Sequence, residues 1–93
     1  MKISIITVTY NSERSIRACL QSVAEQSYKN IEHIIIDGGS TDNTIEIVKN
    51  TPSVSNWISE PDKGIYEALN KGIQRATGDI IGFVLSYDTN FSF

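Results

Sequence analysis

The sequence lacks the features of a disulfide-bonded, membrane-spanning or nucleic-acid-binding protein. It has one cysteine, Cys19, so no internal disulfide can form. No apolar run approaches the ~20 residues that cross a bilayer, and Met1 is not followed by the apolar region and cleavage site of a signal peptide. Lys and Arg total 8 against 11 Asp and Glu, without a basic stripe, so nucleic acid is not an expected partner. We therefore expect a cytoplasmic protein.

Motifs of several common enzyme classes are also missing. No G-x-G-x-x-G follows the first predicted strand, and there is no G-x-x-x-x-G-K-[ST] phosphate loop. Paired Cys/His zinc spacing and a G-x-S-x-G nucleophile motif are absent as well. His33 has no serine or cysteine nucleophile at a spacing typical of a catalytic pair, so we expect a solvent-facing or partly packed strand histidine.

The 93 residues, 40% of them hydrophobic, contain strand patterns that alternate with helix patterns. Strands are predicted over 3–8, 31–36, 56–59 and 80–85, and helices from Asn11 or Ser12 to residue 24, over 41–49 with Ser40 or Thr41 as cap, and from about residue 65 to 76. Strands 31–36 and 80–85 are expected to be buried. This βαβαβαβ order predicts an α/β fold with three α/β/α layers and a mostly parallel, Rossmann-like sheet.

Asp37 follows three isoleucines and precedes Gly38 and Gly39, which places a carboxylate at the carboxyl end of a buried strand. In an open α/β sheet this strand-end crevice is where ligands bind. Asp37 could accept backbone N–H bonds as the cap of a turn, or accept an N–H from a ligand such as a nucleobase. Both interpretations are open from the residues alone.

Two further acids are candidates for chemistry. In Glu60-Pro61-Asp62-Lys63-Gly64, Lys63 and the free N–H groups of a helix start could face a phosphate, or Asp62 could simply cap the helix. Asp88 lies just past the fourth strand, on the same rim as Asp37, and could hold a hard divalent cation or serve as a turn residue.

Four ordered stretches resemble the family 2 glycosyltransferases, which have the GT-A fold. These are Ser4 to Asn11, Ile34 to Thr44 with its Asp-Gly-Gly-Ser-Thr-Asp core, Ile58 to Asn70, and Ala76 to Phe83. The resemblance implies a nucleotide-sugar donor, most often a UDP-sugar, and an inverting transfer to a saccharide or lipid-linked acceptor in polysaccharide or cell-envelope synthesis. It also implies that the protein can attach peripherally to the inner face of the membrane.

The resemblance assigns roles residue by residue. Thr9 and Tyr10 would line the base pocket, Asp37 would pair with the base, and Asp62 with Lys63 would lie beside the nucleotide and sugar. Family members place two acids after the fourth strand, which hold ribose and a Mg²⁺ or Mn²⁺ ion on the diphosphate. Here Tyr87 stands where the first acid belongs, and Asp88 alone matches.

The family's acceptor-binding half and its catalytic base are not in this sequence, so residues 1–93 are expected to form a single partial domain that binds nucleotide. The alternative hypothesis is a non-catalytic α/β module that acts in assembly. A strand that leaves an open sheet edge favours self-association, so a homo-oligomer through that edge is a further expectation.

Overall fold

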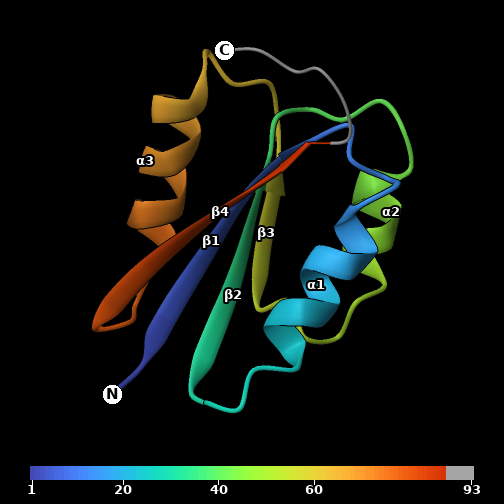
Figure 1. The fold of residues 1–93 in the computed structure, drawn as a ribbon. Helices are drawn as coiled ribbons and strands as arrows, with labels where there is room; N and C mark the ends of the chain where they lie inside the picture. The colour runs from blue at the N-terminus through green and yellow to red at the C-terminus, as the bar shows by residue number, and fades with distance from the viewer. Residues whose placement is uncertain (88–93) are drawn as a thin grey trace.

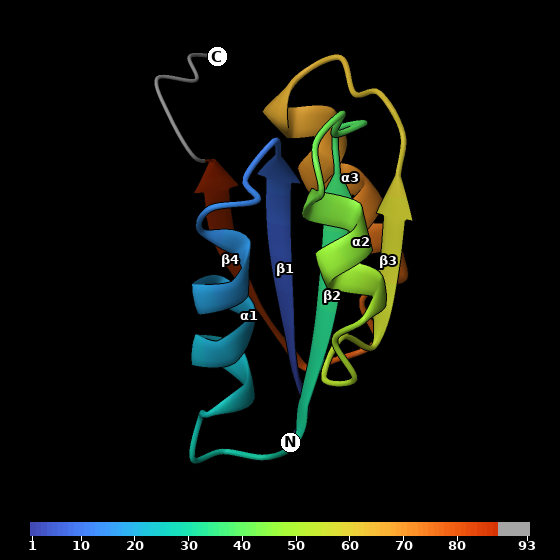
Figure 2. The same cartoon turned by 90° about the vertical axis from the view of Figure 1, so that its right-hand side faces the viewer.

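A computed structural model describes residues 1–87 of the chain, which form one four-stranded sheet with helices on both faces (Figure 1). The strands are β1 (Ile3–Tyr10), β2 (Ile31–Asp37), β3 (Asn56–Ser59) and β4 (Ile80–Tyr87), and the helices are α1 (Ile16–Ala24), α2 (Thr44–Lys49) and α3 (Ile65–Arg75). All pairings are parallel, in the order β3-β2-β1-β4. Figure 2 shows α1 and α2 in front of the sheet and α3 behind it. The predicted three-layer α/β fold is confirmed.

Three consecutive isoleucines of β2, at positions 34–36, connect the two halves of the core. Ile34 and Ile36 pack in the cluster that includes Ala68 of α3, and Ile35 packs against the α1 and α2 cluster that includes Leu20. All three isoleucines are fully buried, as predicted for a strand covered on both faces. Each contributes roughly 1.5–3 kcal/mol of burial free energy, which fixes the central strand that ends at Asp37.

Helix α3 lies unusually close to the sheet at Gly72. A Cβ atom at this position would lie 2.4 Å from Cγ2 of Ile6 on β1, so no larger residue fits without a shift of the helix. The small residue at this position therefore lets the helix approach the sheet. Its start at Ile65 also agrees with the sequence.

Two helices begin later than predicted. Helix α1 starts at Ile16 after Ser15, and α2 starts at Thr44 after Asn43, and neither preceding residue makes a side-chain cap bond. The proposed caps have other partners: the backbone N–H of Asn11 donates to the Ser40 hydroxyl at 2.8 Å. The predicted caps were wrong because these short polar side chains join two loops to each other instead of closing a helix.

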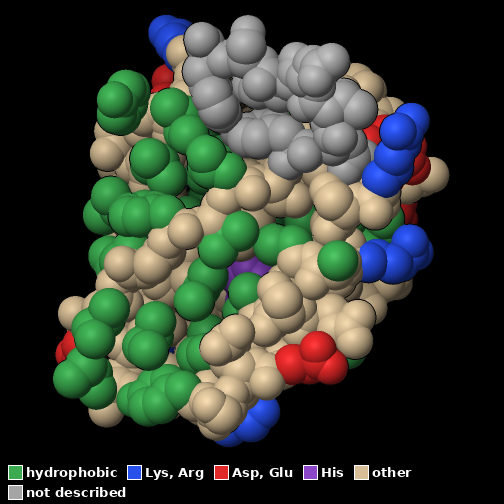
Figure 3. Space-filling model, in the orientation of Figure 1, with side chains coloured by type: hydrophobic (Ala, Val, Ile, Leu, Met, Phe, Trp, Pro, Cys, Tyr) green, Lys and Arg blue, Asp and Glu red, His purple; other side chains and the backbone are tan. Residues whose placement is uncertain are grey.

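Strand β4 is exposed, which corrects the prediction of a buried strand. Ile81, Phe83 and Leu85 are 37%, 49% and 50% exposed, and all three project from the α3 face, because their register partners Ser4, Ile6 and Val8 alternate in the same way. Figure 3 shows hydrophobic side chains gathered on this side of the molecule. Within residues 1–87, β1 is the one strand paired with β4, and α3 contacts β1 and β2 instead.

No helix in the described part of the chain has the length and apolar character needed to cross a membrane.

Candidate functional site

Polar residues of the four strands line up at the carboxyl end of the sheet. The parallel register places Asp37 of β2 between Ser59 of β3 and Thr9 of β1, and Thr9 opposite Ser86 of β4. Thr9 and Asp37 are fully buried, and Ser86 is 6% exposed. The sheet therefore ends in a polar row from which the β1–α1, β2–α2 and β3–α3 loops depart, at the end of the sheet where α/β proteins bind ligands.

Both carboxylate oxygens of Asp37 have partners within the site. Oδ2 accepts the backbone N–H of Gly39 at 3.0 Å, the backbone N–H of Ser40 at 2.7 Å and the hydroxyl of Ser59 at 2.8 Å. Oδ1 accepts the hydroxyl of Ser40. Asp37 thus organises the turn after β2, one of the two roles that the sequence left open. Its pairing with a base stays a prediction.

Thr9 and Tyr10 differ in how they meet the crevice. The Thr9 hydroxyl is hydrogen-bonded to the hydroxyl of Ser12, and the Thr9 carbonyl accepts the N–H of Gly38 at 3.0 Å, so Thr9 lies beneath the crevice floor. Tyr10 is half-buried, and a Cβ atom added to Gly38 would lie 3.4 Å from Cδ1 of its ring. The ring of Tyr10 therefore packs beside the glycine turn, and the base-pocket role of both residues stays a prediction.

The loops after β1 and β2 are joined by side-chain bonds that the sequence analysis missed. Asn11 Oδ1 accepts the N–H of Thr41 at 2.8 Å, and the Ser12 N–H donates to the hydroxyl of Thr44 at 2.8 Å. Asn11 has a positive φ of 45°, a conformation that asparagine tolerates better than most residues. The available signal was the pair of polar runs that directly follow β1 and β2.

The β3–α3 loop lies close to Gly38 and Gly39. Gly39 has φ +87°, and a Cβ atom there would lie 3.3 Å from the backbone nitrogen of Pro61. A Cβ atom at Gly38 would lie 3.5 Å from Oδ2 of Asp62. The structure therefore brings Asp62 beside the turn that Asp37 organises, and glycine is required at Gly39 by both its φ and the close approach of Pro61.

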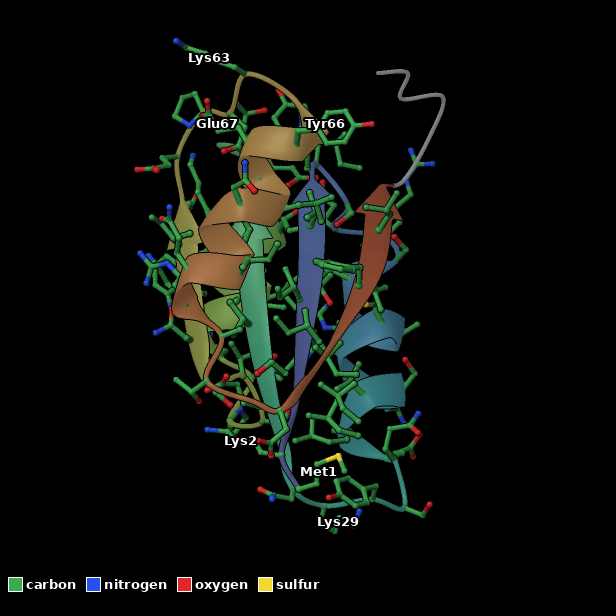
Figure 4. All side chains as sticks on the ribbon, turned by 90° about the vertical axis from the view of Figure 1, so that its left-hand side faces the viewer. Met1, Lys2, Lys29, Lys63, Tyr66 and Glu67 are labelled. Atoms are coloured by element: carbon green, nitrogen blue, oxygen red, sulfur yellow. The ribbon has the colours of Figure 1, made fainter. Side chains whose placement is uncertain are left out.

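Asp62 and Lys63 point in different directions. Asp62 is ion-paired with Lys71 of α3, and the residue before α3 is Gly64, so Asp62 does not cap the helix. Lys63 is exposed, and Figure 4 shows its side chain extending away from the sheet. Tyr66 is 82% exposed on the first turn of α3. Only Asp62 of the predicted Asp62–Lys63 pair faces the crevice.

The described residues contain no cluster of three metal-ligating side chains. No group of three His, Cys, Asp or Glu side chains within residues 1–87 could hold an ion, and the carboxylates of Asp37 and Asp62 already have partners. Asp88, the predicted metal ligand, lies outside the described residues. The expectation of Mg²⁺ or Mn²⁺ at Asp88 therefore stays a prediction.

His33 is fully packed away from this row, which corrects the expectation of a solvent-facing or partly packed histidine. It is 1% exposed, its Nε2 is 2.7 Å from the hydroxyl of Thr7, and its Nδ1 has no partner among the described residues. Burial lowers its pKa to about 4, so the ring is neutral at pH 7. With no access to the crevice, His33 has a structural role.

A cleft between α1 and α2 is separate from the crevice. Arg17, Leu20 and Glu46 are among its lining residues, and none of the predicted site residues in the described part of the chain lines it. We place the candidate site at the strand ends, because the buried carboxylate and the close glycine turn are there.

The sequence and fold were compared with known proteins. The family model for glycosyl transferase family 2 matches residues 4–84. Over 88 residues, 92% of this chain, the sequence is 41% identical to the uncharacterized glycosyltransferase MT1564 of Mycobacterium tuberculosis. Among solved structures, S. aureus TarS in complex with UDP-GlcNAc superimposes with a TM-score of 0.80 at 32% identity. Mannosyltransferase PcManGT of Pyrobaculum calidifontis, in complex with GDP-Man and Mn²⁺, gives 0.79 at 30% identity.

The matches cover most of this chain and a minor part of the other proteins. The TarS and PcManGT superpositions cover 91% and 86% of this chain. The chain spans 34% of MT1564 and 26% of each solved chain. The family match over most of the sequence, the shared fold and the row of polar residues at the strand ends agree with one another. The chain belongs to glycosyl transferase family 2.

Proposed function

We propose that this chain is the donor-binding portion of an inverting glycosyltransferase that uses a nucleoside-diphosphate sugar, with a UDP-sugar as the first candidate. The observation that carries the proposal is the convergence of Asp37, the Gly38–Gly39 turn and Asp62 at the carboxyl ends of β1, β2 and β3. The similarity to TarS, solved with UDP-GlcNAc, and to PcManGT, solved with GDP-Man, supports a nucleotide-sugar as the ligand class.

The crevice offers separate partners for the two ends of such a donor. The half-buried ring of Tyr10 provides a flat surface on which a base can stack. For Asp37 to accept an N–H from the base, Oδ1 must exchange its bond to the Ser40 hydroxyl, while Oδ2 keeps its two backbone bonds. Asp62 lies on the other side of the glycine turn, where the sugar is proposed to bind. The acceptor is proposed to be a saccharide or lipid-linked saccharide of a cell-envelope glycan.

Isothermal titration calorimetry tests this proposal. UDP, UDP-GlcNAc and GDP-Man are titrated into the 93-residue chain with and without Mn²⁺, and we expect heat from at least one uridine nucleotide. Absence of heat from all three ligands under both conditions contradicts donor binding. A gain in affinity with Mn²⁺ that Asp88→Ala abolishes would support a metal dependence through Asp88, and an unchanged gain would refute it.

A second candidate function, assembly through β4, is favoured by the exposed apolar strand. β4 reads Ile-Ile-Gly-Phe-Val-Leu-Ser-Tyr, without a charge or proline that would block edge pairing. We propose a second copy as the occupant, with two β4 strands antiparallel about a two-fold axis. Residues that face each other across an antiparallel strand pair lie on the same face of the sheet. If the two-fold axis passes beside Phe83, Ile81 lies opposite the partner's Leu85. If light scattering gives the molar mass of a monomer at 100 µM, this assembly is overturned. A dimer that Phe83→Lys dissociates would support it.

A further inference from the structure

One lysine of α3 is surrounded by three carboxylates at the edge of the crevice. Lys71 Nζ is 2.9 Å from Oε1 of Glu60 and 3.5 Å from Oε1 of Glu67, and it makes its closest contact with Oδ1 of Asp62. Glu60 and Asp62 belong to the β3–α3 loop, whereas Glu67 and Lys71 belong to α3 itself. Nothing in the sequence distinguishes Lys71, since a lysine in a helix is usually a solvated residue.

The three contacts differ in strength because the carboxylates differ in exposure. The side chains of Glu60 and Glu67 are 48% and 38% exposed, so water and salt screen their attraction to Lys71. The side chains of Asp62 and Lys71 are 9% and 19% exposed, so their ion pair is shielded. The hydrogen bond to Asp62 is the first cause that raises the pKa of Lys71, and the lysine stays charged throughout the physiological range.

The two oxygens of Asp62 have different surroundings. Oδ1 is bonded to Lys71, while Oδ2 lies on the side of Gly38, 3.5 Å from where a Cβ atom of that glycine would stand. Among residues 1–87, no group donates a hydrogen bond to Oδ2, whereas Lys71 fixes Oδ1. A carboxylate held by one oxygen presents the other in a set direction.

We propose that Lys71 is a positioning residue for the donor: it holds Asp62 by Oδ1 so that Oδ2 faces the crevice and accepts a hydroxyl hydrogen of the donor sugar. This inference rests on the proposed function, since it requires a nucleotide-sugar in the crevice. Lys71 does not contact the donor. It acts through Asp62, and it limits the rotation of a side chain that lies on a loop preceding α3.

The proposed role predicts an effect on the sugar and not on the nucleotide. Loss of one charge-assisted hydrogen bond to a sugar hydroxyl weakens UDP-sugar binding by roughly tenfold or more. Affinity for UDP, which has no sugar at this position, changes by less than about twofold on the same argument. A lysine that merely anchored the loop would affect both ligands alike, or neither.

Calorimetry with UDP and UDP-GlcNAc on the folded 93-residue chain separates these cases. Lys71→Met removes the charge and keeps the aliphatic stem, Lys71→Arg keeps the charge, and Lys29→Met is the matched control in the exposed loop before β2. We expect Lys71→Met to lose affinity for UDP-GlcNAc selectively, Lys71→Arg to restore most of it, and Lys29→Met to match the wild type. If Lys71→Met fails to fold, Lys71→Gln replaces it and the same affinity ratio decides.

A double variant identifies Asp62 as the intermediary. In an Asp62→Asn background, Lys71→Met should cause no further selective loss, because the two residues act as one unit. An unchanged ratio of the two affinities in Lys71→Met, or an equal loss for both ligands, overturns the positioning role while donor binding by the wild type stands. A wild type that binds neither ligand overturns the proposed function itself, and with it this inference.

Discussion

Asp37→Asn is the substitution whose cost can be worked out most fully from the structure. The carboxylate accepts bonds from two backbone N–H groups and two hydroxyls, and it is fully buried. An asparagine amide can place its NH₂ at the Oδ1 position, because the Ser40 hydroxyl can turn and become the acceptor there. Its oxygen then stays at the Oδ2 position, facing Gly39, Ser40 and Ser59.

The predicted cost comes from converting three charge-assisted bonds at Oδ2 into neutral ones. Hydrogen bonds to charged groups contribute about 1.5–3 kcal/mol and neutral ones about 0.5–1.5 kcal/mol, so the free energy of unfolding should fall by roughly 3–4.5 kcal/mol. A domain of this length has a total of about 5–14 kcal/mol, so the variant should fold but with a clearly lower urea midpoint.

Urea unfolding followed by circular dichroism measures this effect. The matched control is Asp79→Asn, because Asp79 is exposed and accepts the backbone N–H of Lys2 at 2.9 Å. We expect the control to change the unfolding free energy by about 0.5 kcal/mol or less. An Asp37→Asn variant with the same midpoint and slope as the control would refute the role of Asp37 in organising the turn.

Three further predictions concern stability. Burial lowers the pKa of His33 to about 4, below the unfolded value of 6.5, so unfolding takes up a proton between these two pH values. The free energy of unfolding should therefore fall as the pH falls from 6.5 towards 4. His33→Gln should remove up to about 3 kcal/mol of this loss, measured by urea titrations at each pH. Burial opposes ionisation of Glu32, but hydrogen bonds from Ser4 and Thr77 lower its pKa to about 2. The free energy of unfolding should therefore also fall between pH 4.5 and 2, by an amount on the order of 1–2 kcal/mol after solvent screening, and Glu32→Gln should remove this loss. Gly72→Ala should destabilise the chain by about 1–3 kcal/mol in thermal unfolding, because its Cβ would collide with Ile6; an unchanged midpoint would contradict the close packing of α3.

The strand and helix order could be predicted from the sequence because the apolar pattern alone determines it. Ile34, Ile35 and Ile36 indicate a central strand whichever neighbours it has, and β3 was predicted at its observed bounds. The burial of β4 could not be predicted in this way, since a run such as Ile80 to Leu85 looks the same in a central strand and at an edge. Pairing order depends on contacts between distant segments.

The candidate site likewise contains residues that could be predicted from the sequence and contacts that could not. Asp37, Gly39 and Asp62 were found from the sequence because a strand end and a turn are local features. The ties from Asn11 and Ser12 to the β2–α2 loop, and the pair between Asp62 and Lys71, join residues that are 9 to 32 positions apart. Such bonds appear only once the fold sets the loops side by side, and for this reason the predicted helix caps were wrong and Lys71 was missed.

The central claim is that a nucleotide-sugar binds at the carboxyl ends of β1, β2 and β3. The most direct test is a titration of UDP-GlcNAc into the ¹⁵N-labelled chain, followed by backbone amide chemical shifts. We predict shifts at Tyr10, Gly38, Gly39 and Asp62, with little change at Gly78, which lies at the opposite end of the sheet beside Ser4. Shifts confined to the cleft between α1 and α2, or no shifts at millimolar ligand, would contradict the account.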